Sequence, residues 1–467
     1  MADDASVAAR CPNCARLERR IAELEQRVAQ LEQLLEKATR AQKRQAAPFS
    51  KGTPKPDPKT PGRKAGEPYG PKAHRPLPEP KPDEIIDVPL PRECPDCGGL
   101  TEEDHVDQQF QVEIPRQPLV RRFDIHVGRC RRCGRRLRPR HSLQTSDATG
   151  AAASQLGPDV QALIALMKDK YGLSYGDIQG LLDEAFGIAV SRGGAAQVVL
   201  RVAERHEPAY DAIQQIVRHS DTVYPDETGW KIGGWLQWLW VFVTPTATLC
   251  MIRPSRGHDV PEAVLGADYD GRMTHDGWSP YDFFQKATHQ QCLAHLLRRA
   301  QGLLERATRG SVRFPRKVAE FLGDALALRD GRDEGVLSPH GLAVARGRLE
   351  KRLDRLLEGK LSHPGNAKFQ KHLMGHREEI LTFLYELDIE ATNWPAEQAV
   401  RPLVVNRKIF GGNRTASGGH AQEVLGSVFA TLTQRTLDTL RFVSRIICLP
   451  ADQRLCLIQQ LLPVSSD

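Results

Sequence analysis

The chain has 467 residues, of which 40% are apolar and 26% are charged, and its formal net charge is +7. This length predicts about three domains rather than one. No run of ~18 apolar residues is present, which argues against a membrane span, and the N-terminal sequence lacks the charged-then-apolar design of a signal peptide. We therefore expect a cytoplasmic protein.

The positive charge is concentrated in two segments of the first third. Residues 41–82 contain 10 basic and 3 acidic residues, and residues 116–140 contain 10 basic and 1 acidic residue. The remainder of the chain has a net charge of −9. This distribution predicts polyanion binding by the front of the chain and a different role for the rear.

The first expected element is a coiled coil within residues 1–45. Apolar residues recur at alternating spacings of 4 and 3, and Glu, Arg and Gln predominate between them. These positions are Leu17, Ile21, Leu24, Val28, Leu31 and Leu35. We expect a parallel homodimer or a higher oligomer, and the alternative is one amphipathic helix packed on its own chain.

Residues 46–90 are predicted to be a Pro- and Lys-rich linker. Eleven prolines fall within residues 41–82, which excludes a helix or a central strand there. The segment should be an extended tether. It either follows DNA phosphates or stays solvated.

Two CxxC pairs predict a zinc ribbon at residues 91–141. Cys94, Cys97, Cys130 and Cys133 have the spacing with which thiolates bind one tetrahedral Zn²⁺, and 32 residues separate the pairs. Residues 108–115 and 121–130 are predicted strands between them. The second pair carries candidate DNA contacts, at Arg131, Arg132 and Arg135. A purely structural ribbon is the alternative.

A third pair, Cys11 and Cys14, precedes the heptad pattern. A parallel dimer would bring two copies of this pair together, which makes a second Zn²⁺ shared between chains possible. Two free thiols are the alternative.

Residues 150–215 are predicted to form a helical module of three helices. Ser174 is a suitable N-cap for the second helix, and Gly187 and Ser191 bracket the following turn. This pattern resembles a helix-turn-helix unit whose last helix reads DNA. Generic three-helix packing explains it almost as well.

From His219 the pattern changes to strands rich in Trp, Val and Phe. A three-stranded meander is followed by a short helix, a strand ending at Asp276, and a further strand that runs into a helix. The order β-β-β-α-β-α-β-α predicts an α/β fold of the ribonuclease H-like type. The predicted segments are the first part of the core at 216–302, a helical insertion at 303–390, the return of the core at 391–420 and a helical tail at 421–467, including one helix over 424–447.

Three acidic residues, Asp226, Asp276 and Glu397, are the candidate catalytic and metal-binding residues. In this fold an Asp on the first strand lies beside an Asp after the fourth, and a carboxylate from a later helix completes the group. Such a group can hold two Mg²⁺ or Mn²⁺ ions ~3.5–4 Å apart for phosphodiester chemistry. Each acid also has a local explanation, as a turn residue, an Asp-Gly turn and a first-turn helix acid.

Several neighbours of these acids are candidates for supporting roles. Arg401 lies four residues after Glu397 and on the same helix face, where it could pair with that Glu or contact a phosphate. The basic strip after it predicts DNA contact by Arg407, Lys408 and Arg414. His295 either lies near the metals or is a satisfied buried histidine. Cys292 is expected in the core, because no partner spacing supports zinc.

Seven short sequence motifs resemble those of a known family. They are DETGW, WLWVFVTP, PSRG, HDGWSPY, QCLAHLLR, AEQAVRPLVVNRK and FGGNRT. Together they resemble the insertion-sequence-66 transposases of bacteria over nearly the whole chain. The resemblance implies a Mg²⁺-dependent DDE transposase whose triad matches Asp226, Asp276 and Glu397. It also implies binding of double-stranded DNA at the element ends and target, a location at the bacterial nucleoid, and helper proteins encoded beside the transposase. The alternatives are a non-enzymatic DNA-binding protein with an inactive core, and a nuclease that cuts without joining.

Overall fold

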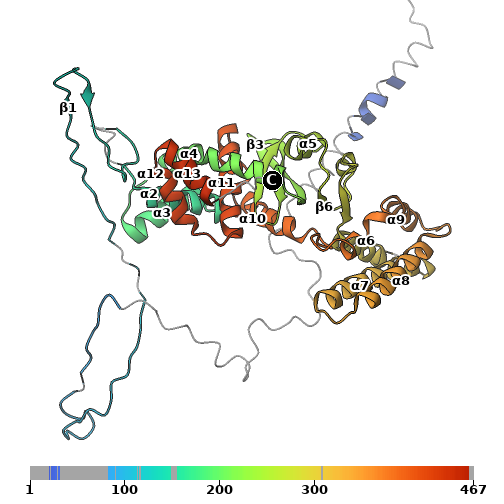
Figure 1. Cartoon of the computed structure of the whole chain (residues 1–467), viewed down its shortest axis with the longest axis horizontal. Helices are drawn as coiled ribbons and strands as arrows, with labels where there is room; N and C mark the ends of the chain where they lie inside the picture. Colours follow the sequence, from blue (N-terminus) through green and yellow to red (C-terminus); the bar gives the residue numbers. More distant parts are fainter. Residues whose placement is uncertain are drawn as a thin grey trace, which may run out of the picture. The chain divides into compact units, whose positions relative to one another are not determined.

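A computed structural model gives the fold of most of the chain (Figure 1). It describes residues 20–31 without 22 and 29, 82–148 without 90, 113, 115 and 116, 155–306, and 309–461. The chain divides into two compact units, residues 1–112 and 113–467. Cys11 and Cys14 lie outside the described residues, and so does most of the predicted linker.

A five-stranded mixed sheet forms the centre of the second unit. Its strands are β3 (Thr222–Ile232), β4 (Trp235–Val243), β5 (Thr248–Arg253), β6 (Arg272–His275) and β7 (Thr288–Gln291). Their order across the sheet is β5-β4-β3-β6-β7. The first three strands form an antiparallel meander, and β3, β6 and β7 run parallel. This confirms the mixed α/β class, and the sheet is compatible with a ribonuclease H-like core.

The connections between strands differ in one place from the expected order. Helix α5 (Asp259–Leu265) connects β5 to β6, but β6 is joined to β7 only by the 3-10 turn η3 (Ser279–Phe283). Helix α6 (Leu293–Arg306) follows β7 directly. The predicted helix between the fourth and fifth strands is therefore only this turn, because the 12 residues between β6 and β7 include Gly277 and Pro280.

The two faces of the sheet are covered by different helices. Helix α10 (Trp394–Phe410) packs on the face that carries Tyr224, Trp230 and Val241. The opposite face, with Val223, joins the larger core that includes helix α4 (Arg192–Arg218). Because side chains alternate along a strand, Asp226 shares the face of Tyr224 and Trp230, whereas Glu227 points to the opposite one.

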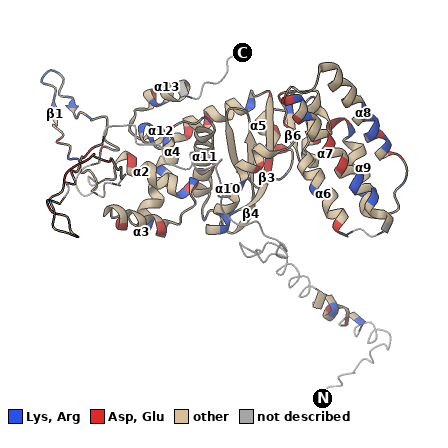
Figure 2. Ribbon diagram, turned by 90° about the horizontal axis from the view of Figure 1, so that it is seen from below, with Lys and Arg blue, Asp and Glu red and all other residues tan. Residues whose placement is uncertain are grey.

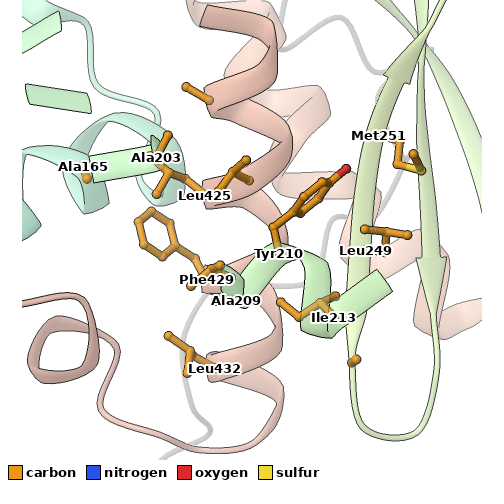
Figure 3. Close-up of a cluster of buried hydrophobic side chains, with 14 of the residues drawn as sticks. Ala165, Ala203, Ala209, Tyr210, Ile213, Leu249, Met251, Leu425, Phe429 and Leu432 are labelled. Atoms are coloured by element: carbon orange, nitrogen blue, oxygen red, sulfur yellow. The ribbon is translucent and has the colours of Figure 1, made fainter. Parts of the chain in front are cut away.

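Helix α11 (Ala416–Gln434) covers the edge strand β5 and satisfies its outer amides. The backbone N–H groups of Thr248, Cys250 and Ile252 donate to Thr431 Oγ1, Ser427 Oγ and Glu423 Oε1 at 3.0, 2.8 and 2.9 Å. A step of four residues on the helix matches a step of two on the strand, since both advance ~6 Å. Figure 3 shows the apolar side chains that pack behind this edge. They are Leu425, Phe429 and Leu432 of α11, Ala203, Tyr210 and Ile213 of α4, and Leu249 and Met251 of β5.

The helical module precedes the sheet and packs on α11 and on helix α12 (Thr439–Cys448). It comprises α2 (Pro158–Ala165), a π-helical turn η2 (Leu166–Lys170), α3 (Tyr175–Phe186) and α4 (Arg192–Arg218). Ser174 caps α3 in a capping box with Asp177, Gly187 ends α3 in the left-handed region, and Ser191 caps α4. The three predicted cap and turn residues therefore act as the sequence indicated.

The segment between α6 and α10 is helical and has its own apolar core. Its helices are α7 (Arg313–Asp333), α8 (Pro339–Leu357) and α9 (Pro364–Gly375), with the turns η4 (Arg309–Val312), η5 (Arg377–Glu379) and η6 (Thr382–Leu384). Phe321, Leu353 and Phe369 are among its buried residues. Figure 2 shows that α7 and α8 both carry basic and acidic residues.

Two further predictions about secondary structure are wrong. The single helix over 424–447 is divided into α11 and α12 (Thr439–Cys448), because Thr436 has a φ of 55° and Asp438 caps the new helix by accepting from Arg441 N; α13 (Ala451–Leu461) follows. The described residues of 108–115 form no strand, and only Gly128–Arg129 (β1) within 121–130 does, paired with Arg136–Leu137 (β2). Apolar side chains such as Val112 are exposed, and a strand without a partner gains too little burial to persist.

Residues 20–31 are helical where described, and Ile21, Leu24, Val28 and Leu31 are exposed. Leu17 and Leu35 lie outside the described residues, so the coiled coil stays a prediction. Among the described helices, none combines the length and apolar character that crossing a membrane requires.

Candidate active site

The candidate site lies where the parallel strands β6 and β7 end beside the middle of β3. Thr222 pairs with Arg272 and Arg272 with Thr288, and the register from β6 to β7 extends to His275 and Gln291. Asp226 lies four residues beyond Thr222, as Asp276 does beyond Arg272, and Cys292 follows Gln291. Continuing the register places these three residues in one row across neighbouring strands, which lie ~4.8 Å apart.

Glu397 joins this row from the first turn of α10. Asn393 precedes the helix and fixes its start: its backbone N–H donates to Cys292 Sγ at 3.1 Å, and its Nδ2 donates to the Pro225 carbonyl at 2.7 Å. Leu293 N also donates to the Ala391 carbonyl at 3.0 Å. The return of the chain after 121 residues is therefore fixed to β3 and to the end of β7.

The carboxylates interact electrostatically across these elements. Burial raises the pKa of Asp226 to about 7, and the negative charges of Glu227, Asp276 and Glu397 add to that effect. The Glu227 backbone N–H donates to Asp226 Oδ1 at 3.0 Å and opposes part of the shift. A half-buried carboxyl surrounded by like charges is a group whose ionised form a divalent cation would stabilise.

Asp276 is held in a tight turn that requires glycine next to it. The Trp278 backbone N–H donates to Asp276 Oδ1 at 3.0 Å. Gly277 has a φ of 81°, and a Cβ there would lie 2.4 Å from Gln291 Oε1 and 2.9 Å from the His372 ring. The Asp-Gly turn of the sequence is thus real, and it presents the Asp276 carboxylate beside Asp226.

Behind the site, Glu227 is a buried carboxylate that the sequence alone did not single out. Its side chain is 2% exposed, and Oε1 accepts from Arg256 Nη2 at 2.7 Å and Nε at 2.9 Å. Tyr281 donates to Oε2 at 3.1 Å. Arg256 also stacks on Trp278 and Trp238, with its guanidinium carbon 4.1 and 4.6 Å from the ring centroids. Arg256 of the PSRG motif therefore supplies the counter-charge for Glu227 of the DETGW motif.

A second residue that the sequence alone did not single out, Arg298, lies on α6. Arg298 Nη2 donates to Glu397 Oε1 at 2.6 Å and to His295 Nε2 at 2.9 Å. The buried Cys292 Sγ, His295 and Glu397 have ligand atoms that all lie within 4.8 Å of one another. Burial lowers the pKa of His295 and raises that of the Cys292 thiol. Residues i and i+3 on a helix face the same way, which was the only sequence signal for Arg298.

The candidate DNA-binding arginines have different surroundings. Arg401, Lys408 and Arg414 are exposed, whereas Arg407 Nη1 donates to Thr228 Oγ1 at 3.1 Å and to the Gly229 carbonyl. Arg407 thus fastens α10 to β3.

The two tryptophans near the aspartates differ in exposure. Trp230 is fully buried, and its Nε1 donates to Asn413 Oδ1 at 2.6 Å, while Trp278 is 37% exposed.

The two CxxC pairs adopt the same turn, each within its own unit. Cys94 N donates to the Gly99 carbonyl and Cys130 N to the Arg135 carbonyl, at 2.8 and 2.9 Å. Gly98 and Gly134 follow with φ of 73° and 70°. Backbone hydrogen bonds lower the pKa of Cys94 and of Cys130. The pairs belong to different units, so the joint zinc site stays a prediction. Arg131, Arg132 and Arg135 are exposed on the second pair.

Comparison with known families adds one finding. The family model described as "Transposase IS66 family" matches residues 153–421, which include the helical module, the sheet, the helical insertion and all three carboxylates. No curated protein matches the chain. Since this match covers more than half of the 467 residues, the chain belongs to the IS66 transposase family.

Proposed function

We propose that this protein is a DNA transposase that cleaves the ends of its mobile element and joins their 3′-hydroxyls to target DNA. The observation that carries the proposal is the position of Asp226 on β3 and of Asp276 directly after the neighbouring strand β6. Glu397, on α10, is close enough for its negative charge to help raise the pKa of Asp226. The family match supports the same conclusion.

The residues at this site fit divalent metal ions. Asp226, Asp276 and Glu397 supply oxygen ligands, which Mg²⁺ and Mn²⁺ prefer, and the mutual repulsion of the three carboxylates favours a cation among them. When bound, two such ions would activate a water or 3′-hydroxyl and stabilise the leaving oxygen. Asn393 and the Asp276–Trp278 turn hold the carboxylates in place.

Helix α10 is the proposed path of the DNA away from the site. Its solvent-facing stripe contains Arg401, Val405 (48% exposed), Lys408 and Ile409 (56% exposed), and Arg414 follows the end of the helix. Cations interleaved with apolar side chains suit a duplex backbone. Arg407 has a positioning role in this proposal, because its guanidinium is bonded to β3.

The remaining parts are assigned to recognition and pairing of the ends. We propose that Cys94, Cys97, Cys130 and Cys133 bind one structural Zn²⁺ and present Arg131, Arg132 and Arg135 to DNA, together with the helical module. The N-terminal helix would pair two protomers, as synapsis of two ends requires. A second Zn²⁺ at Cys11 and Cys14 and helper proteins encoded nearby remain parts of the proposal.

Neutralising the α10 stripe should weaken DNA binding without changing the fold. The triple variant Arg401→Gln, Lys408→Gln, Arg414→Gln should reduce the magnitude of the negative slope of log K against log[salt] by about 2–3, since each duplex phosphate contact contributes ~0.9. Fluorescence anisotropy with a labelled duplex at several salt concentrations measures this. Arg316→Gln, on the exposed side of α7, should leave the slope unchanged. Equal slopes for the triple variant and wild type would remove α10 from the DNA path.

A joining assay tests the proposed reaction. Wild-type protein, Mg²⁺, a duplex ending in the element's 3′-hydroxyl and a supercoiled target plasmid should give a covalently joined product. Glu397→Gln should reduce joining by more than ~10²-fold, since even changes behind a metal ligand cost about 10–100-fold. Cutting without joining would indicate a nuclease, and joining unaffected by Glu397→Gln would reject the assigned site.

A further inference from the structure

Beside the carboxylate row lies a group of three side chains with a different donor set. It contains a thiol, an imidazole and a carboxylate, from Cys292, His295 and Glu397, and their ligand atoms are all within 4.8 Å of one another. Ligands of a tetrahedral zinc site, with bonds of about 2.0–2.3 Å, lie ~3.3–3.8 Å apart. Side-chain rotations alone can close the remaining gap.

The thiol is fixed by the backbone around it. Cys292 N donates to the His275 carbonyl at 2.7 Å, and its own carbonyl accepts from His295 N at 3.1 Å. Asn393 N donates to Sγ at 3.1 Å, and a hydrogen bond of this kind stabilises a thiolate. The sulfur therefore has a defined direction, toward the start of α10 and Glu397. The expectation that Cys292 is only a core residue accounts for its burial but not for this arrangement.

His295 has one ring nitrogen without a hydrogen-bond partner. Arg298 has only donors, so the bond from its Nη2 makes His295 Nε2 the acceptor and places the ring proton on Nδ1. That Nδ1 is buried, has no hydrogen-bond partner, and lies 3.7 Å from Glu397 Oε1. A buried N–H without an acceptor has a free-energy cost, because it has lost its hydrogen bond to water. The tautomer with its proton on Nε2 removes this cost, directs the Nδ1 lone pair at the site and breaks the bond to Arg298.

We infer that Cys292, His295 and Glu397 form a site for a thiophilic divalent cation such as Zn²⁺ or Co²⁺, and that Arg298 competes with the cation for this site. Sulfur and imidazole donors favour these ions over Mg²⁺, which prefers oxygen. Three protein ligands leave a fourth position open, as in zinc sites that accept an exchangeable ligand. Arg298 is 59% exposed and can leave toward solvent.

One consequence rests on the proposed catalytic role of Glu397. A cation at the thiol site would use the same carboxylate that completes the row with Asp226 and Asp276. Zinc would therefore inhibit a Mg²⁺-dependent reaction by taking Glu397. Binding of Zn²⁺ itself does not depend on that role, so the two ideas can fail separately.

Zinc binding by the full chain tests the inference without DNA. After dialysis against Zn²⁺ and removal of the unbound ion, the metal content of wild type should exceed that of Cys292→Ser by one ion per chain. Cys448→Ser, a half-buried thiol on α12, is the matched control and should bind as wild type does. The other cysteines are present in all these chains, so their zinc cancels in the comparison.

Two further variants guard against loss of structure and test the competition. His295→Gln keeps the thiol and should lower Zn²⁺ affinity by more than ~10-fold, with an unchanged circular dichroism spectrum. Arg298→Gln should raise the affinity. Equal zinc content and affinity in wild type, Cys292→Ser and His295→Gln would overturn the site, and an unchanged or lower affinity in Arg298→Gln would overturn the competition.

Discussion

Asp226→Asn should make the protein more stable at pH 8 and remove the proposed metal-dependent activity. Burial, and then the charges of Glu227, Asp276 and Glu397, raise the pKa of Asp226 to about 7, against ~3.9 in the unfolded chain. Between these values the folded protein binds more protons than the unfolded one. Stability is therefore lost as pH rises from about 4 to about 7, and it stays lost above that. Asn is neutral and keeps the acceptor for Glu227 N, so it avoids this loss.

Thermal unfolding from pH 4.5 to 8 measures the effect. The melting temperature of Asp226→Asn should exceed that of wild type at pH 8, and the two should converge near pH 4.5. Mg²⁺ should raise the melting temperature of wild type and have little effect on the variant, because a ligand that binds the folded state stabilises it. Asp211→Asn, at an exposed position on α4, should behave as wild type in both respects. A variant less stable than wild type at pH 8, or one still stabilised by Mg²⁺, would contradict the role given to Asp226.

The second large effect is expected at Arg256. Removing this side chain leaves the Glu227 carboxylate buried without its counter-charge. Breaking a fully buried pair costs about 3–5 kcal/mol, and we expect about 2–4 kcal/mol for Arg256→Ala, because the guanidinium is 37% exposed. Loss of its stacking on Trp238 and Trp278 adds to the effect.

A double variant separates charge from packing. Arg256→Met with Glu227→Gln removes both charges, keeps much of the volume and retains an acceptor for Tyr281. It should recover most of the stability in urea unfolding, whereas Arg348→Ala, at an exposed position on α8, should cost little. If the double variant is as unstable as Arg256→Ala, the loss is one of packing and not of an unpaired charge.

The placement of the two aspartates could be predicted from the sequence because it depends on strand order. Apolar and aromatic runs separated by turn residues define β3, β4 and β5, and Asp226 and Asp276 occupy equivalent places on parallel neighbours. Local signals also worked at Ser174, Gly187 and Ser191, where caps depend on adjacent residues alone.

Side-chain pairs from distant segments could not be predicted. Nothing near Glu227 in the sequence indicates Arg256, and nothing near Glu397 indicates Arg298, since these contacts exist only once the sheet and α10 are assembled. The break before α12 had a readable signal, the cap at Asp438, which the continuous apolar pattern concealed. Residues 108–115 alternate like a strand, but alternation cannot supply the partner that a strand needs.

The location of the bound metal tests the catalytic centre most directly. Crystals of the full chain with a cleaved-end duplex and Mn²⁺ would show the ion by anomalous scattering. We expect Mn²⁺ within ~2.0–2.5 Å of carboxylate oxygens of Asp226, Asp276 and Glu397. Manganese bound elsewhere, or three carboxylates too far apart to share ions, would contradict the assignment of a metal-dependent active site to this row.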